Sequence, residues 1–168
     1  LPDFADQKVA YITQTTLSLK DTADIIKKLR ERYPHIEGPK SSDICYATTN
    51  RQEVVEQMAP EVDLTLVIGS QNSSNSNRLK ELSENLGTPA KLIDGAQYLQ
   101  SDWFGASVEK VGLTAGASAP EFLVDEVIER LRDEFGFGQV REIKLKEEDV
   151  VFKLPKNLRA ELSESASA

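Results

Sequence analysis

The sequence predicts an α/β protein: a parallel sheet with helices on both faces. Short apolar runs alternate with amphipathic stretches, which is typical of consecutive βα units. Residues 63–69 are almost continuously apolar, as expected of a strand buried on both faces. Hydroxyl-rich loops follow the apolar runs. In α/β proteins such loops lie at the carboxyl ends of strands, where helix N-termini point towards ligands.

The first forty residues predict a strand and a helix. Residues 8–12 form a short β-rich run that ends in the polar loop 13–16. Residues 21–30 then place their apolar side chains on one helical face, with an acidic start and a basic end that suit the helix dipole. Pro34 ends this helix, and residues 35–40 form a connector at which we expect a domain boundary.

From about residue 41 the alternation becomes more regular. Asn50 predicts an N-cap for a helix that stops at Pro60. The remaining predicted elements are strands at residues 63–69, 90–93 and 111–113, and helices at residues 78–86 and 120–135, the last with Pro120 in its first turn. Residues 139–168 read as a tail in which residues 150–155 could add an edge strand.

Composition excludes several classes of function. The chain has 168 residues, of which 39% are hydrophobic, and carries a net charge of −8. A pI near 4.8 argues against nucleic-acid or membrane-surface binding, which needs a basic face. We also expect no signal peptide and no membrane-spanning segment, because no apolar run approaches the required ~20 residues. The single cysteine excludes an internal disulfide and favours a cytoplasmic protein.

The loop at residues 70–77 is the strongest local signal of a ligand site. Eight consecutive small polar residues offer many hydrogen-bond donors to an anion, although such a cluster can also be a solvent-exposed turn. The loop has no Walker ending. Residues 114–118 are similarly placed, and their small side chains suit either an approaching ligand or tight helix–sheet packing. The ligand that best fits these loops is small and phosphorylated.

Cys45, in the loop at residues 41–50, is a candidate thiolate. It lies just before a predicted helix N-terminus, which favours a thiolate, whereas a lone cysteine is more often a small buried hydrophobe. One thiolate cannot hold a zinc ion or an iron–sulfur cluster, so any such site needs ligands from outside this chain. Thr15 and Thr16 could donate to a ligand or cap the next helix.

Four segments together resemble the signature motifs of one family. The segments are residues 11–18, 43–52, 69–79 and 112–121. They are similar to the 4-hydroxy-3-methylbut-2-enyl diphosphate reductases, the LytB/IspH family. The similarity runs from the first predicted strand to the last predicted helix, and the motifs occur in the family's order.

The resemblance implies an iron–sulfur oxidoreductase of isoprene biosynthesis. Enzymes of this family reductively remove the allylic hydroxyl of their substrate and give isopentenyl and dimethylallyl diphosphates, the last step of the methylerythritol phosphate pathway. The implied fold is a trefoil of three similar α/β domains around a 4Fe-4S cluster held by three cysteines, one per domain. Cys45 looks like the third of these ligands. The implied electron donor is a ferredoxin or a flavodoxin.

The resemblance also assigns the polar loops to the substrate. The implied substrate-binding residues are Thr15, Thr16, Ser73, Ser74, Asn75 and Ser118. Within this set Ser73, Asn75 and Ser118 look like ligands of the diphosphate, with Ser74 in the same loop. Thr15 matches a threonine near the substrate hydroxyl and is the candidate catalytic residue.

The remaining parts of such an enzyme are expected upstream of Leu1. They are the other two cluster cysteines, the substrate-contacting histidines and a glutamate for proton delivery. We therefore expect a C-terminal fragment that is inactive alone: residues 1–40 end the middle domain, residues 41–138 form the last domain, and residues 139–168 form a tail. One alternative is a stand-alone module that binds a diphosphate metabolite without redox chemistry. Another is a structural or interaction piece, in which Cys45 belongs to the core and the loops are turns.

Overall fold

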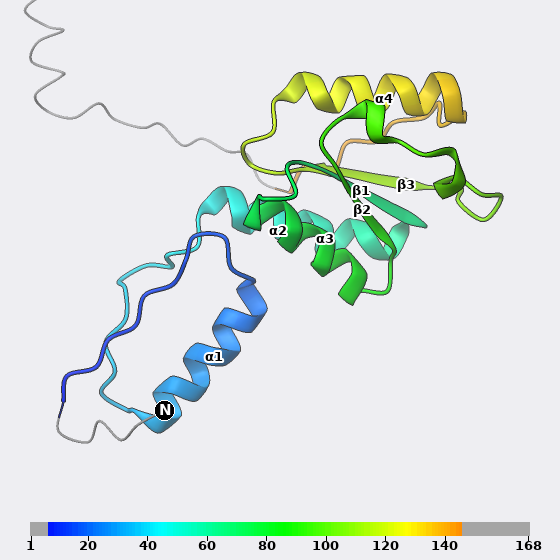
Figure 1. Ribbon diagram of the computed structural model, residues 1–168. Coiled ribbons are helices and arrows are strands. Elements are labelled where there is room, and N and C mark those ends of the chain that lie inside the picture. Colours follow the sequence, from blue (N-terminus) through cyan, green and yellow to red (C-terminus); the bar gives the residue numbers. More distant parts are fainter. Residues whose placement is uncertain (1–6, 146–168) are drawn as a thin grey trace, which may run out of the picture.

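The computed structural model describes residues 7–145 and has α/β architecture (Figure 1). Its elements in chain order are α1 (Leu19–Arg32), α2 (Tyr46–Met58), η1 (Ala59–Glu61), β1 (Leu64–Ile68), α3 (Ser74–Asn85), β2 (Ala90–Ile93), η2 (Ala96–Tyr98), η3 (Ser101–Trp103), β3 (Val111–Ala115) and α4 (Glu121–Phe135). Among the described helices, none is both long enough and apolar enough to cross a membrane.

The sheet is parallel, with the strand order β2-β1-β3. Thr65 of β1 lies opposite Ala90 of β2 and Gly112 of β3. α4 covers one face of the sheet, and α2 and α3 cover the other (Figure 1). All five residues of β1 are buried, because this central strand has a helical layer on each side. The predicted fold class is confirmed.

The side chains of β1 alternate between two apolar cores, as the pleat of a strand requires. Leu64, Leu66 and Ile68 pack in one core with Val127 and Leu131 of α4. Val67 faces the other way and joins a second core with Val55, Met58, Ala59 and Leu79.

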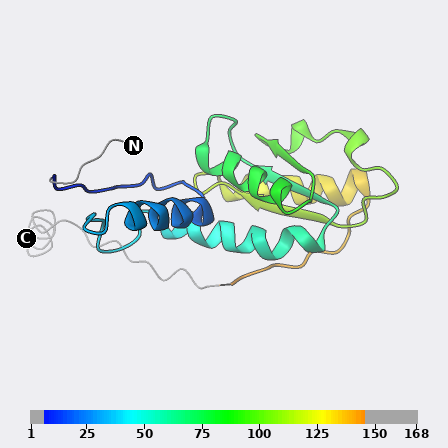
Figure 2. The same ribbon diagram turned by 90° about the horizontal axis from the view of Figure 1, so that it is seen from below.

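α1 and the segment that precedes it extend beyond one end of the sheet (Figure 1; Figure 2 shows the same arrangement from below). Within this unit Ala10 pairs with Glu37 in an isolated parallel bridge. The predicted strand at residues 8–12 is therefore wrong, because within the described residues this run has a pairing partner at one position only.

Two predicted helix starts are also wrong. α2 begins at Tyr46 with Cys45 as its N-cap, so Asn50 lies inside the helix. α3 begins at Ser74, four residues before the predicted start, because Ser73 caps it by accepting the Ser76 N–H at 3.3 Å. At α4 the difference is one residue, with Pro120 as the N-cap. The possible edge strand at residues 150–155 lies outside the described residues.

Asp63 holds the loop before β3 and gives the fold a predicted pH dependence. Its Oδ2 accepts the backbone N–H groups of Lys110 and Glu109, each at 2.9 Å. These bonds hold the pKa of Asp63 below its usual value of 3.8. Because the folded-state pKa is the lower one, the stabilisation is present above about pH 4 and is lost as the pH falls through the folded-state pKa.

Asp63→Asn is therefore expected to lower the free energy of unfolding at neutral pH, since the asparagine keeps an acceptor but loses the charge. The difference in the free energy of unfolding between this variant and the parent protein is expected to shrink as the pH falls below about 4. Urea denaturation at a series of pH values measures it. A difference that stays constant down to acid pH would contradict the assignment.

Candidate functional site

Two of the predicted polar loops lie side by side at the carboxyl edge of the sheet. The Gly116 N–H donates to the Ile68 carbonyl at 2.8 Å, so the loops that follow β1 and β3 start next to each other. Ser73 comes from the first of these loops and Ser118 from the second. The carboxyl edge is where α/β domains bind ligands, and the structure brings the starts of these two loops together there.

The loop after β1 is held in place by its own side chains. The Ser73 Oγ accepts both the Ser76 N–H at 3.3 Å and the Ser76 hydroxyl at 3.0 Å. The Asn77 Nδ2 donates to the carbonyl oxygens of Gln71 at 2.7 Å and Ser73 at 3.0 Å. This network argues against an open, solvated turn, because its hydrogen bonds hold the loop against the start of α3.

Asn75 is buried in the first turn of α3 without a hydrogen-bond partner. Its side chain is 6% exposed, and both the Nδ2 and the Oδ1 atoms are buried and unpaired among the described residues. A buried amide in this state costs about 1–3 kcal/mol. Such a group indicates a partner that residues 7–145 do not supply. Ser74, its neighbour, is exposed.

Ser118 is presented by a tight turn. The Ala119 N–H donates to the Gly116 carbonyl at 3.0 Å, and the Ser118 side chain is exposed. Pro120, the N-cap of α4, provides no side-chain hydrogen bond to the helix. The first N–H groups of α4 therefore remain available next to the Ser118 hydroxyl.

Cys45 lies at the same edge, as the N-cap of α2. Its thiol is free, half-buried and makes no side-chain cap hydrogen bond. The Arg51 Nε donates to the Ala115 carbonyl at 3.1 Å, which places the first turns of α2 beside the end of β3. Among the described residues no three His, Cys, Asp or Glu side chains gather into a possible metal site. The role of Cys45 as one ligand of a larger metal site therefore stays a prediction.

Thr15 and Thr16 lie in the turn before α1 and do not cap it. The cap is Ser18, whose Oγ accepts the Asp21 N–H at 3.2 Å, so the capping alternative for the two threonines is wrong. The Thr15 carbonyl accepts the Cys45 N–H at 3.0 Å, and its side chain is exposed. The structure therefore joins the threonine turn directly to the cysteine.

We call the contact between residues 13–19 and residues 43–52 the threonine–cysteine seam. Besides the bond from Cys45, the Asp43 Oδ2 accepts the Thr13 N–H at 2.9 Å. The Gln52 side chain accepts the Leu19 N–H at 3.0 Å and donates to the Leu17 carbonyl at 2.9 Å. The sequence analysis missed Asp43 and Gln52 as individual residues, although both lie in a motif that carries the family resemblance.

Gln52→Ala is expected to open the seam. Gln52 is 2% exposed, and its loss would leave a partly buried N–H and a partly buried carbonyl without this partner, so we expect a loss of about 1–2 kcal/mol in the free energy of unfolding. Chemical denaturation measures the loss, and hydrogen exchange at the Leu19 amide reports the local opening. Unchanged exchange at Leu19 would show that Gln52 does not hold the seam.

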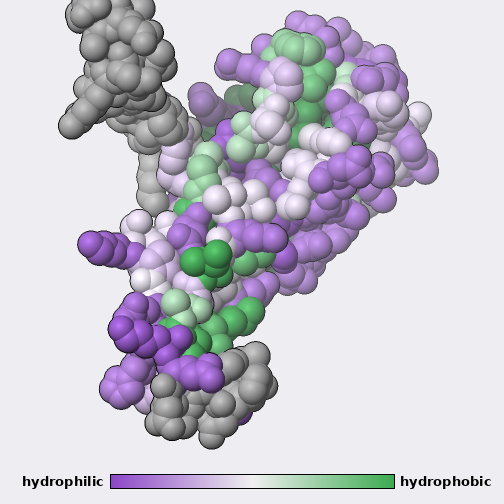
Figure 3. Space-filling model, turned by 60° about the vertical axis from the view of Figure 1, so that its left-hand side comes forward, coloured by the Kyte–Doolittle hydropathy of each residue, from purple (hydrophilic) through white to green (hydrophobic). Residues whose placement is uncertain are grey.

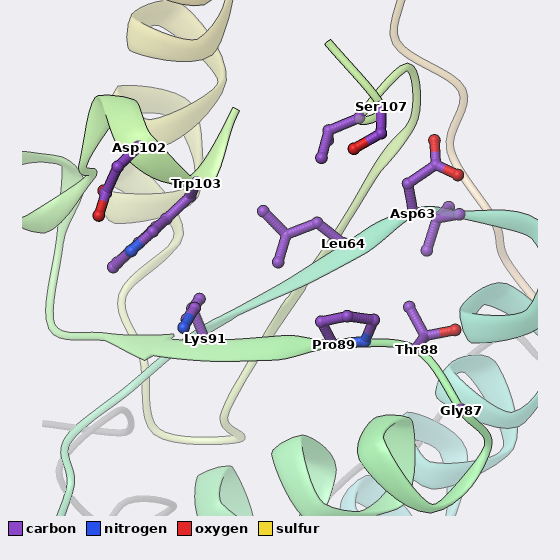
Figure 4. A pocket seen from close by; sticks show the side chains of 11 residues that line it. Asp63, Leu64, Gly87, Thr88, Pro89, Lys91, Asp102, Trp103 and Ser107 are labelled. Atoms are coloured by element: carbon purple, nitrogen blue, oxygen red, sulfur yellow. The ribbon is translucent and has the colours of Figure 1, made fainter. Parts of the chain in front are cut away.

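A shallow cavity of about 680 Å³ lies at the opposite edge of the sheet (Figure 4). Its lining includes Asp63 and Leu64 at the start of β1, Lys91 of β2, and Trp103. The Lys91 Nζ lies 5.5 Å from the centre of the Trp103 ring. None of the predicted site residues lines this cavity. The carboxyl edge remains the candidate site, since the loops and the unpaired Asn75 gather there.

The parallel sheet and the polar loops at its carboxyl edge place the chain among the α/β domains, the class in which small ligands bind at that edge. The model of one family, described as LytB protein, matches residues 1–132. The chain belongs to this family.

Several relatives named 4-hydroxy-3-methylbut-2-enyl diphosphate reductase are similar to this chain. The relative from Hahella chejuensis is 57% identical over 151 residues, which cover 90% of this chain and 47% of the relative. The relative from Pseudomonas aeruginosa is 54% identical over 149 residues (89% and 47%). The relative from Tolumonas auensis is 54% identical over 159 residues (95% and 51%). The chain thus spans about half the length of the curated relatives it matches.

Two solved structures are also similar. The E-1-hydroxy-2-methyl-but-2-enyl-4-diphosphate reductase from Plasmodium falciparum superposes with a TM-score of 0.88 at 36% identity, covering 99% of this chain and 52% of that chain. A structure of (E)-4-hydroxy-3-methyl-but-2-enyl diphosphate reductase gives a TM-score of 0.51 at 34% identity, covering 74% of this chain and 43% of that chain. Both are consistent with an α/β domain of a multi-domain fold.

Proposed function

We propose that this chain is the C-terminal portion of a 4-hydroxy-3-methylbut-2-enyl diphosphate reductase, acting in the last step of the methylerythritol phosphate pathway. In this proposal residues 1–40 end the middle domain of a three-domain trefoil, residues 41–138 form the last domain and residues 139–168 are a tail. Family membership supports the assignment. The observation that carries it is the buried, unpaired Asn75 beside Ser73 at the carboxyl edge.

The diphosphate would be held by neutral donors at helix N-termini. The Ser73 hydroxyl and the Asn75 Nδ2 belong to the start of α3, and the Ser118 hydroxyl stands before α4. Ser74, the first residue of α3, and Thr16, in the turn before α1, would add further hydroxyls. Hydrogen bonds to a charged acceptor are stronger than neutral ones, so no lysine-rich loop is required.

Cys45 would supply one of three thiolates to a 4Fe-4S cluster. It fits that role as a free, half-buried thiol at a helix N-terminus, a setting that favours negative charge. When bound, the cluster supplies the electrons that break the allylic C–O bond. Thr15, held beside Cys45 by the seam, would orient the substrate hydroxyl. The electron donor would be a ferredoxin or a flavodoxin, in the cytoplasm.

The exposed apolar side chains of residues 7–40 support a longer protein. Ile12 is 88% exposed and Ile25 is 59% exposed, and Figure 3 shows apolar patches on this part of the surface. Isolated exposed apolar residues are common, but two large ones on so small a unit suit packing against another domain. We propose that these side chains pack against the part of the protein that corresponds to the half of the relatives' length not spanned by this chain.

The second candidate is a stand-alone module that binds a diphosphate metabolite without redox chemistry. It is favoured by the location of the anion-binding groups. Ser73, Asn75 and Ser118 all lie within this chain, whereas Cys45 is its single cysteine. Anion binding could therefore persist where cluster binding does not.

A chimera tests the proposal. It joins the upstream half of the Hahella chejuensis relative to this chain, which replaces the matching half. We expect iron-dependent reduction of 4-hydroxy-3-methylbut-2-enyl diphosphate. Cys45→Ala is expected to remove most of the bound iron, whereas Ser118→Ala keeps the iron and raises KM about tenfold. Equal iron content with Cys45 or alanine at this position would overturn the ligand assignment.

A further inference from the structure

Ser76 is buried directly beneath the loop after β1 and is not one of the candidate site residues. Its side chain is 1% exposed, and its hydroxyl donates to the Ser73 Oγ at 3.0 Å. Its backbone N–H donates to the same oxygen at 3.3 Å. Ser76 therefore contacts Ser73 twice, once through the helix cap and once through its own side chain.

The two bonds fix the direction in which the Ser73 hydrogen can point. A serine hydroxyl has one hydrogen to donate and two lone pairs to accept with. Both lone pairs of the Ser73 Oγ are occupied by donors from Ser76. A buried hydroxyl such as that of Ser76 needs an acceptor, and among the described residues the Ser73 Oγ is the acceptor it has. The Ser73 hydrogen must then point away from Ser76.

Two glycines leave the space that this arrangement needs. A Cβ at Gly69, directly after β1, would collide with the Ser76 Oγ, and so would a Cβ at Gly116, directly after β3. The Ser76 hydroxyl thus occupies the point where the ends of two strands meet the start of α3. This enclosure restricts its rotation and keeps its hydrogen on Ser73.

We propose that Ser76 is a positioning residue that makes the Ser73 hydroxyl an obligate donor towards the ligand. The inference rests on the proposed function, because it takes the ligand to carry a diphosphate. A deprotonated phosphate oxygen accepts hydrogen bonds and donates none, so it matches a hydroxyl that can only donate. A ligand group that must itself donate, such as an ammonium, finds no acceptor at Ser73.

A double-mutant cycle on the full 168-residue chain tests the proposal, with inorganic pyrophosphate as the probe and titration calorimetry as the readout. Ser73→Ala is expected to weaken binding about tenfold and Ser76→Ala about fivefold. In the doubly substituted protein, binding is expected to be no weaker than with Ser73→Ala alone, because Ser76 acts through Ser73. Additive losses would overturn the positioning role.

Ser83→Ala is the matched control. Ser83 is also a fully buried serine of α3, but its Oγ lies 2.9 Å from the Thr65 Oγ1, in the body of the domain. The Ser83→Ala substitution is expected to lower the melting temperature and to leave the affinity for pyrophosphate unchanged. Ser73→Ala removes a helix cap worth about 1 kcal/mol, so each variant is compared well below its melting temperature.

The outcomes separate this inference from the proposed function. If Ser73→Ala leaves pyrophosphate affinity unchanged, the proposed diphosphate site is wrong. If Ser73→Ala weakens binding and Ser76→Ala does not, only the positioning role is wrong. A neutron structure provides a ligand-free measurement: the Ser76 deuterium is expected between the two oxygens, and a Ser73 deuterium in that place would overturn the inference.

Discussion

Replacing Asn75 with leucine is expected to stabilise the fold and to abolish anion binding at the same time. Leucine has a similar shape and size but no polar atoms. The substitution removes a buried amide that has no partner within residues 7–145, so the free energy of unfolding is expected to rise by about 1–2 kcal/mol. It also removes the amide that would face the diphosphate. Opposite changes in stability and affinity mark a residue retained for binding.

Urea denaturation and pyrophosphate titration of the 168-residue chain measure the two effects. Asn77→Leu is the matched control on the same helix. The Asn77 amide is paired with the carbonyls of Gln71 and Ser73, so its loss is expected to destabilise the protein by about 1–2 kcal/mol. If Asn75→Leu were as destabilising as Asn77→Leu, Asn75 would have a structural partner after all.

Gly116→Ala is expected to destabilise the protein by about 2–3 kcal/mol, the upper range for overpacking, and Ser76→Ala is expected to restore most of that loss. The added Cβ at Gly116 would collide with the Ser76 Oγ, while its distance to the Ser76 Cβ is an ordinary 3.7 Å. Removing the oxygen therefore removes the clash. Chemical denaturation of the two single variants and the double variant gives the coupling energy.

Gly69→Ala provides the contrast. Its Cβ would collide with the Ser76 Oγ as well, but it would also lie 2.9 Å from the Ser76 Cβ. Ser76→Ala keeps that carbon, and the φ of 157° at Gly69 strains any residue with a Cβ, so no rescue is expected at Gly69. Rescue at both glycines, or at neither, would contradict this account of how α3 packs on the strand ends.

Burial made the sheet predictable. β1 has helices on both faces, and this requires the apolar run that marks residues 63–69. Helix starts were less predictable because several residues of the right type compete for one cap. Ser73 caps α3 from within a run of eight small polar residues, and Cys45 takes a place where Asn50 looked more suitable. Residues 8–12 have a strand-like composition, but a strand also requires a partner strand along its length, and among the described residues this run pairs only at Ala10.

The sequence predicts the loops of the candidate site but not the contacts that support them. Hydroxyl-rich loops after strands indicate the carboxyl edge, and the structure confirms that those after β1 and β3 meet there. Gln52 and Ser76 were missed because they act through atoms distant in sequence or through the geometry of a cap. Gln52 binds main-chain groups 33 and 35 positions away. Nothing in the local pattern of α2 distinguishes such a glutamine from a surface residue.

The threonine–cysteine seam has a mechanical consequence. Because the Thr15 carbonyl accepts the Cys45 N–H, and Gln52 and Asp43 bond to the flanking residues, hydrogen bonds join the threonine turn to the start of α2. A hinge that separated Thr15 from Cys45 would have to break these hydrogen bonds, although the expected domain boundary at residue 40 lies between the two residues in the chain. A movement that keeps these hydrogen bonds would carry the backbones of Thr15 and Cys45 together.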